Sequence, residues 1–274
     1  MKKYLSFLIV ICLLILPAFA KVDKTSADYL KSKNHISAIN PFVEHMISKA
    51  IKQSLKKELK GNYKVKFSGY TLSSIKSGVF KYMEITGEDF VINDIPIPYT
   101  NIKTLSDYNR INYKQTPIVV ESDIELEILT KLSEESINEA LKSEEYMKVL
   151  RQINKKAFPV FTLSGVKVKI KGERVYIIMS YNFPLAPREK DRTFMVSSKF
   201  KILNDEIKSY DVAFNEKYGN LPIDKVNNLV NLVNPLNFTL KLIDEKNCDC
   251  KIENIKIEDD IIAINAKMYI KGEK

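Results

Sequence analysis

Apolar residues recur at three- and four-residue spacing from Asn40 to Gly61, which is the longest helical pattern in the chain. Asn40 is a favourable N-cap, and Pro41 fits the first helical position because its missing N–H group costs nothing there. Gly61 suits the left-handed position that follows a last turn. We therefore expect a helix about 30 Å long, with one continuous apolar stripe that a sheet, a lipid or a membrane surface must cover.

Strand patterns follow this helix. From residue 62 to residue 68 apolar and polar positions alternate, as is typical of a half-buried strand. The clearest strands after it are predicted at residues 80–85, 90–92 and 118–129. Pro96 and Pro98 indicate a sheet edge or a loop at residues 95–99, because proline cannot donate to a strand ladder.

Helices and hairpins alternate in the second half of the chain. Ser133 is the expected N-cap of a helix that runs to about Lys155, and Ser143 is a point where that helix can break. A shorter helix is predicted at residues 223–233. Because the strands return through hairpins rather than helical crossovers, the pattern predicts an α+β fold with a large antiparallel sheet. The hairpin turns are expected at residues 172–173, 204–205 and 259–260.

Lysines line one side of the first of these hairpins. Lys167, Lys169 and Lys171 alternate with apolar residues, so they are expected to form a row on the solvent face of the strand. The returning strand, residues 175–181, is more fully apolar. The lysine row is therefore a candidate contact surface for an anionic partner.

Residues 1–20 have the pattern of a secretory signal peptide. Lys2 and Lys3 are followed by an apolar run from residue 5 to residue 16 and by an Ala-Phe-Ala cleavage site at residues 18–20. We expect the mature chain, residues 21–274, to form a single domain that is exported and soluble in the periplasm or cell envelope after cleavage.

Charge and cysteine content fit that setting. The formal net charge of +9 falls to about +7 without Lys2 and Lys3. Export argues against a nucleic-acid partner, so the charge is expected to favour an anionic membrane surface. The expected mature chain retains Cys248 and Cys250, which predict no disulfide framework. These two cysteines can close a strained small ring or stay as plain thiols.

The sequence lacks motifs for catalysis. It has neither a Gly-x-Ser-x-Gly elbow nor a phosphate-binding loop, and His35 and His45 lie outside any zinc-ligand motif. We predict no cofactor, no metal site and no enzymatic activity. A lipid-active hydrolase is an alternative, because catalytic groups can assemble from distant positions.

The chain resembles a known family in several segments. These are the helix start at residues 133–143, the lysine-alternating hairpin that follows it, and Asn234-Pro235-Leu236 before a last amphipathic hairpin. Residues 76–80 are similar to a small-residue turn that leads into a strand. Together they resemble the LmeA-like family of secreted bacterial phospholipid-binding proteins. The resemblance implies a tubular lipid-binding fold of the bactericidal/permeability-increasing class. In that fold a large curved antiparallel sheet wraps around a long amphipathic helix, with two further helices here, and leaves an apolar groove for acyl chains.

A groove for a two-chain lipid needs apolar walls and a mouth with cationic or hydrogen-bonding groups. The predicted wall residues come from the first helix and from the sheet: Phe42, Met46, Ile47, Ile177, Met179 and Phe200. The residues predicted to contact headgroups or a membrane lie in one loop: Phe183, Leu185, Arg188, Lys190 and Arg192. The ordinary alternatives are core packing for the first set and a solvated hairpin loop for the second.

We therefore expect an exported envelope protein that binds a phospholipid or similar amphiphile in an apolar groove, for lipid transport or envelope maintenance. Its expected partners are that amphiphile and an anionic membrane surface. The alternative is a non-catalytic structural or interaction module of the envelope, with a closed core and with the lysine row turned to an anionic partner. An open slot would distinguish the carrier from the module.

Overall fold

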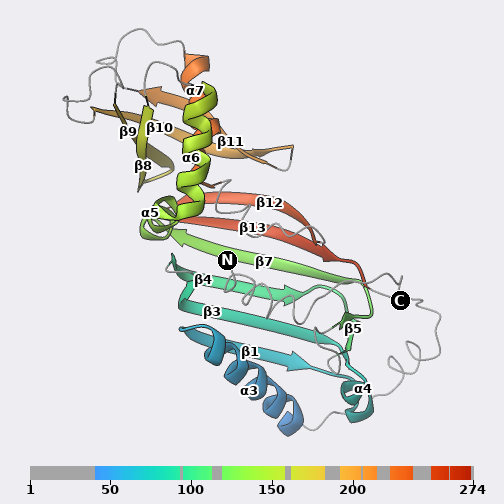
Figure 1. The fold of residues 1–274 in the computed structure, drawn as a ribbon. Coiled ribbons are helices and arrows are strands. Elements are labelled where there is room, and N and C mark those ends of the chain that lie inside the picture. The colour runs from blue at the N-terminus through green and yellow to red at the C-terminus, as the bar shows by residue number, and fades with distance from the viewer. Residues whose placement is uncertain are drawn as a thin grey trace. The chain divides into compact units, whose positions relative to one another are not determined.

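The computed structural model has an α+β fold in which the sheets are mostly antiparallel (Figure 1). This confirms the predicted fold class at that level. Residues 1–20 lie outside the described residues, so the expected signal peptide is not part of the description. The described residues are 41–92, 95–112, 119–157, 162–182, 192–204, 206–214, 223–236, 248–258 and 260–272.

Where the sequence predicts a single domain over residues 21–274, the chain divides into two compact units. Unit 1 contains the described residues of Met1–Thr130, Asp244–Lys251 and Asn265–Lys274. Unit 2 contains those of Lys131–Ile243 and Ile252–Ile264. Each unit is described by itself below.

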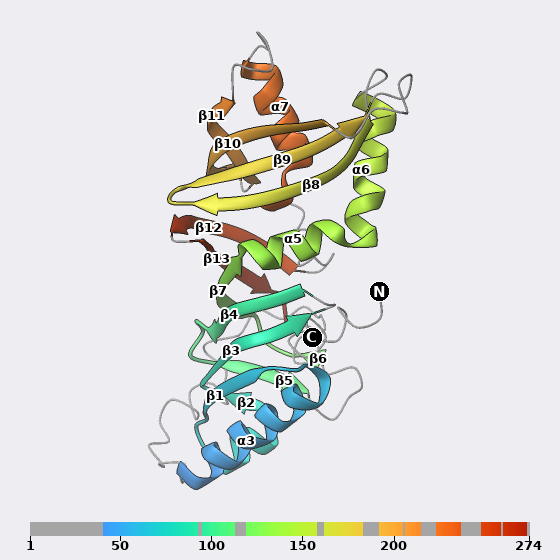
Figure 2. The ribbon, with the colours of Figure 1, turned by 90° about the vertical axis from the view of Figure 1, so that its left-hand side faces the viewer.

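Unit 1 is built on an antiparallel sheet with helix α3 (Pro41–Glu58) packed against its first strand (Figures 1 and 2). A short helix, α4 (Leu72–Lys76), which the sequence patterns did not predict, leads into a small second sheet. The successive strands of the main sheet in this unit are β1 (Asn62–Ser68), β3 (Tyr82–Ile92), β4 (Ile95–Thr104) and β7 (Ile124–Ser133). The small sheet consists of β2 (Val79–Phe80), β5 (Asn109–Asn112) and β6 (Val119–Val120). The main sheet continues through β13 (Ile261–Ile270) and β12 (Cys248–Glu258), and β7, β12 and β13 each have residues in both units.

The prediction of an edge or loop at residues 95–99 is wrong, because these residues begin β4, an interior strand between β3 and β7. Ile92 of β3 pairs with Ile95 of β4 across a hairpin. In a two-residue hairpin the closing pair exchanges hydrogen bonds, so the next residue along, Pro96, and then Pro98 turn their nitrogen atoms away from β3. The two prolines therefore leave the β3–β4 ladder intact.

Helix α3 begins at Pro41, as predicted, but it ends at Glu58, before Gly61 is reached. The predicted capping role of Gly61 is therefore wrong. Close packing requires this glycine instead. Its φ is +152°, and a Cβ atom at this position would lie 2.3 Å from the Cβ atom of Phe90.

Tyr63 is buried beside these residues, opposite Gly87 in the β1–β3 ladder. Its ring centroid lies 6.0 Å from that of Phe90. Its hydroxyl is buried and has no hydrogen-bond partner among the described residues. Burial raises the pKa of Tyr63 to about 12.

Changing Tyr63 to phenylalanine is expected to stabilise the protein by about 1 kcal/mol at neutral pH, because it removes a buried hydroxyl without a partner. The unfolded tyrosine ionises near pH 10 and the folded one near pH 12, so ionisation of Tyr63 favours the unfolded state and the protein loses stability as pH rises through this window. The Tyr63→Phe variant should lose less stability over the same window. Urea unfolding at neutral pH and across this alkaline range measures both effects, and a destabilised variant at neutral pH would contradict the expectation.

The described residues of unit 2 form a four-stranded antiparallel sheet in the order β11-β10-β9-β8 and three helices (Figure 2). Its strands are β8 (Thr162–Lys171), β9 (Arg174–Asn182), β10 (Arg192–Leu203) and β11 (Glu206–Phe214). Its helices are α5 (Glu134–Lys142), α6 (Glu144–Ala157) and α7 (Ile223–Val233).

Local signals in unit 2 have the predicted effects. Ser133 caps α5, since its hydroxyl accepts the N–H of Ser136 at 3.1 Å. Ser143 separates α5 from α6, which confirms the break and makes two helices of the one predicted over residues 133–155. At two of the predicted hairpin turns Gly172 and Asn204 adopt φ values of +60° and +54°, and Asp260 follows at +68° in the third.

Asparagine side chains bind the backbone along the β8 edge of this sheet. Asn138 of α5 donates to the carbonyl of Val168 at 2.9 Å and accepts the N–H of the same residue at 2.8 Å. Asn154 of α6 makes the same pair of bonds with Leu163, at 2.8 and 2.9 Å. The two amides take the place of a neighbouring strand, so backbone groups of an edge strand are paired.

The opposite edge, β11, is bound in a related way from α7 and the turn after it. Asn231 accepts the N–H of Ser209 at 2.8 Å. Asn234 donates to the carbonyl of Ile207 at 2.8 Å. Helices therefore supply hydrogen-bond partners to both edges of the sheet in unit 2.

The inner face of this sheet packs against the helices and forms the core of unit 2. Tyr146 of α6 lies within the core and donates its hydroxyl to the carbonyl of Val233 at 2.9 Å, and burial raises the pKa of Tyr146. The buried strand residues include Val168, Ile170, Val175, Ile177, Met179, Phe194, Val196, Phe200 and Ile207. The buried helix residues include Ile137, Leu141, Tyr146, Leu150, Val226 and Val230.

Candidate functional site

Helix α3 carries apolar side chains on two opposite sides. Leu55 is fully buried and Ile51 is half-buried on the side that faces β1. Nine residues separate Met46 from Leu55 and Phe42 from Ile51, which is two and a half turns of an α-helix. Met46 and Phe42 consequently face outward and are 51% and 65% exposed. The prediction of a single continuous apolar stripe is wrong, because its spacing mixes two stripes half a turn apart.

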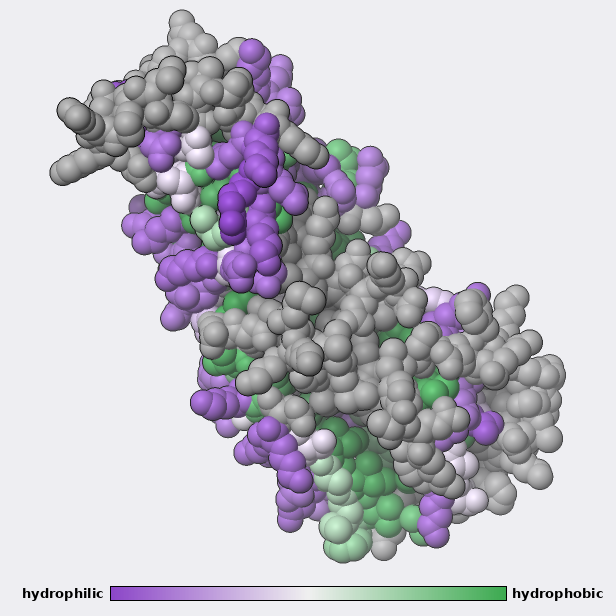
Figure 3. Space-filling view, viewed as in Figure 1, coloured by the Kyte–Doolittle hydropathy of each residue, from purple (hydrophilic) through white to green (hydrophobic). Residues whose placement is uncertain are grey.

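The surroundings of this outward apolar pair are cationic along the helix. Lys49, Lys56 and Lys57 are exposed on the following turns. Apolar colouring gathers over the region of α3 and α4, beside a band of hydrophilic side chains (Figure 3). Ile47, the third predicted wall residue of the helix, is half-buried toward the sheet. We call Phe42 and Met46 the α3 apolar surface.

The predicted wall residues of the sheet lie in unit 2, not in unit 1 with α3. Ile177 and Met179 of β9 and Phe200 of β10 are all buried on the inner face of the four-stranded sheet. Val196 and Phe194 are the register partners of Ile177 and Met179 on β10. These positions are therefore packed into the core of unit 2 in this structure.

The outer face of the same sheet has exposed side chains on β8 and β10, and these strands and β9 lie in front of α7 in Figure 2. Lys167, Lys169 and Lys171 are exposed on β8, so the predicted lysine row is confirmed. Register places Lys169 opposite Tyr176 and Lys167 opposite Ile178. Met195 continues the line from Ile178 onto β10 and is 42% exposed. The lysine row thus borders a strip of apolar and aromatic side chains.

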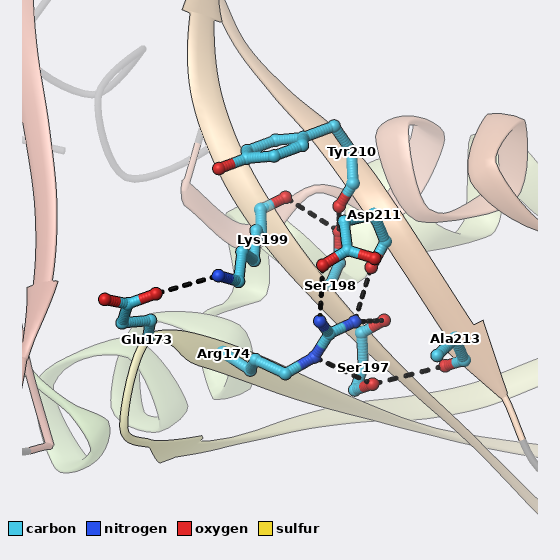
Figure 4. Close-up of polar contacts among 8 residues, drawn as sticks. All are labelled: Glu173, Arg174, Ser197, Ser198, Lys199, Tyr210, Asp211 and Ala213. Atoms are coloured by element: carbon cyan, nitrogen blue, oxygen red, sulfur yellow. Dashed lines mark hydrogen bonds and ion pairs between the residues drawn. The ribbon is translucent and has the colours of Figure 1, made fainter.

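A polar network joins β9, β10 and β11 next to this strip (Figure 4). Arg174 binds the carboxylate of Asp211 at 2.7 Å and the hydroxyl of Ser197 at 3.3 Å. Asp211 has a φ of +49° and lies where the β10–β11 register shifts by one residue. Buried Ser198 donates to the carbonyl of Tyr210 at 3.0 Å. The network therefore holds a β-bulge in place.

Charges at the margin of this network neutralise one another. Lys199 donates to Glu173 at 2.8 Å, and this bond lowers the pKa of the Glu173 carboxyl and raises that of the Lys199 ammonium. Lys208 forms an ion pair with Glu206. Arg174 is likewise paired with Asp211. The polar cluster in Figure 4 is therefore a structural element of the sheet.

The predicted membrane-contact loop falls largely outside the description. Phe183, Leu185, Arg188 and Lys190 lie outside the described residues. Arg192 begins β10 and is exposed.

An open pocket of about 260 Å³ lies on unit 2. It is smaller than the roughly 300–1,000 Å³ of typical small-molecule pockets. Lys256 and Glu258 in its wall form an ion pair at 2.7 Å. The residues that line it are Lys131, Lys256, Glu258, Ile261 and Ala263. The small volume and the ion pair in its wall make this pocket a poor site for an acyl chain.

Among the described residues, no group of three or more His, Cys, Asp or Glu side chains is placed to hold a metal ion. None of the helices in the described ranges has the length and apolar character needed to cross a membrane. No protein-family model, curated protein or solved structure matches the chain.

Sequence reasoning missed the apolar strip on the outer face of unit 2. The signal was present in β9, where Tyr176 and Ile178 alternate with Val175, Ile177 and Met179. Both faces of that strand are apolar, which is typical of a strand covered on both sides. In this structure the second face is partly exposed to solvent.

Proposed function

We propose that this chain is an exported envelope protein that binds a phospholipid or a similar amphiphile without covalent chemistry. The observation that carries the proposal is the α3 apolar surface. Phe42 and Met46 face away from the sheet, and exposed lysines follow on the same helix. A helix with exposed apolar side chains beside cations suits contact with acyl chains and phosphate groups together.

The proposal includes a finer fold assignment. The antiparallel sheet and α3 are the parts from which a tubular lipid-binding arrangement of the LmeA-like kind would be built, with α3 facing a lipid. The signal-peptide pattern of residues 1–20 and the net charge of +9 support a setting at an anionic membrane.

A non-catalytic module with a closed core is the second candidate. Burial of Ile177, Met179 and Phe200 favours it, because these positions hold core side chains rather than the walls of an open slot. In that case the lysine row, and not an internal groove, would be the functional surface.

Native mass spectrometry with lipid extraction tests the proposal on protein purified from an exporting host. The expected result is one co-purifying phospholipid per chain. Changing Phe42 and Met46 together to serine should weaken lipid binding by about 2 kcal/mol, or roughly thirtyfold, because each side chain loses apolar area that the lipid covers.

The matched control changes Leu203 and Leu232 to serine. These leucines are exposed to a similar degree, 50% and 49%, and lie in unit 2. The control should retain its lipid. Absence of bound lipid in the unchanged chain, together with no transfer of labelled phospholipid between vesicles, would reject the carrier and favour the closed module.

A further inference from the structure

Among the described residues, no acidic side chain neutralises the lysine row on β8. Ion pairs elsewhere on the same face use Arg174, Lys199 and Lys208. Lys167, Lys169 and Lys171 form no ion pair with an acidic side chain in the part of the chain that the structure describes. Their positive charge is therefore available to a partner.

The geometry of the row is regular. The three lysines occupy alternate positions of one strand, so neighbouring Cα atoms are about 6.6 Å apart. Asn138 holds the backbone of β8 at Val168, between Lys167 and Lys169. The anchored strand thus presents three lysines from alternate positions to one side.

Apolar side chains lie beside these charges on the same face. Tyr176 and Ile178 are half-buried next to Lys169 and Lys167, and Met195 is more exposed one strand further on. A soluble polyanion needs only the charges. A bilayer surface uses both, because cations meet phosphate groups while aromatic and apolar side chains enter the interface.

We propose that the outer face of the four-stranded sheet in unit 2 docks on the surface of a bilayer that contains anionic phospholipid. The contact residues are Lys167, Lys169 and Lys171 with Tyr176, Ile178 and Met195. This inference rests on the proposed function for its setting at a membrane, and its residues are separate from the α3 apolar surface.

Sedimentation with vesicles tests the inference. The probes are vesicles of phosphatidylcholine alone and vesicles in which about one third of the lipid is phosphatidylglycerol. Binding is expected only to the anionic vesicles, and it should be lost in about 1 M salt, where charges are screened beyond about 3 Å. Equal binding to both vesicles would overturn the proposal.

Changing Lys167, Lys169 and Lys171 together to glutamine should weaken vesicle binding about 100-fold, since each lysine near an anionic surface contributes about fivefold. The control changes Lys64, Lys142 and Lys148 to glutamine, which removes the same charge from exposed sites elsewhere. If both triple variants lose binding equally, net charge and not this face carries the interaction, and the proposal fails.

Met195→Ser separates a bilayer from a soluble polyanion as the partner. The variant keeps every charge, and weaker binding to anionic vesicles, by severalfold, is expected from it. Unchanged vesicle binding by this variant, with equally tight binding of the unchanged chain to polyphosphate, would reject the bilayer as occupant.

The two proposals can fail independently. The lysine variant should still co-purify with lipid, and the variant with serine at Phe42 and Met46 should still bind anionic vesicles. If only the variant with serine at Phe42 and Met46 lost vesicle binding, the membrane contact would be assigned to α3 and not to this sheet face.

Discussion

Replacing Asn138 with alanine is expected to lower the free energy of unfolding by about 3 kcal/mol, because it leaves the buried N–H and carbonyl groups of Val168 without partners. Each of these backbone groups loses a hydrogen bond that water cannot replace at a buried position. Denaturant unfolding measures the change in stability.

Asn228→Ala is the matched control for this change. Asn228 is exposed on α7 and alanine favours a helix, so its replacement is expected to be neutral or slightly stabilising. Asn138→Asp refines the test, because a carboxylate can accept the Val168 N–H but cannot donate to the Val168 carbonyl. Equal stability of all three variants would show that the amide is not needed at the β8 edge.

Replacing Gly78 with alanine is expected to destabilise the protein by at least about 3 kcal/mol, since strain and a steric clash coincide at this position. Gly78 follows α4 with a φ of +81°, and a Cβ atom there would lie 1.7 Å from the carbonyl oxygen of Ile111. The clash is with backbone, and Ile111 donates its N–H to Gly78 at 3.0 Å, so neither side can move freely. Denaturant unfolding gives the change in stability.

Two other glycines separate the causes. Gly172 has a φ of +60° and open space around it, so its change to alanine should cost only about 1 kcal/mol from the backbone conformation. Gly165 lies in β8 with a φ outside the left-handed region and nothing near its side-chain position, so Gly165→Ala should be neutral or stabilising. A series in which the three variants lose the same stability would contradict the assigned roles.

Short-range signals in the sequence were enough to locate most elements. Pro41, Ser133 and Ser143 lie at helix boundaries, where the proline ring and the serine side chain act locally, so the sequence alone predicts these boundaries. Turn residues such as Gly172 and Asn204 work in the same local way.

Features that depend on distant neighbours were not predictable in this way. Pro96 and Pro98 can lie in a strand paired with β3 because the register of the β3–β4 hairpin turns their nitrogen atoms away from β3, and composition does not reveal register. In the sequence Asn138 and Asn154 are ordinary polar residues of a predicted helix, and their role is evident only from their hydrogen bonds to β8 in the structure.

The candidate site shows the same limit. Phe42 and Met46 are four residues apart, as residues on one side of a helix often are, but they do not lie on the same side as Leu55. The two stripes are distinguished only when the angular position of each residue is followed along the whole helix. Ile177 and Met179 have the composition expected of a lipid-contacting wall and of a closed core alike. The sequence pattern does not show whether such residues are buried. In this structure their burial assigns them to the closed core.

The asparagines that bind the two sheet edges differ in whether they are synthesised before or after the strand that they bind. Asn138 and Asn154 precede β8, so this strand meets its partners as soon as it forms. Asn231 and Asn234 follow β11, whose edge stays open until α7 has been made. A growing chain that ends between Phe214 and Asn234 is thus open to pairing with another chain along β11. A chain that folds only after its synthesis is complete does not pass through a state in which β11 is folded and its edge has no partner.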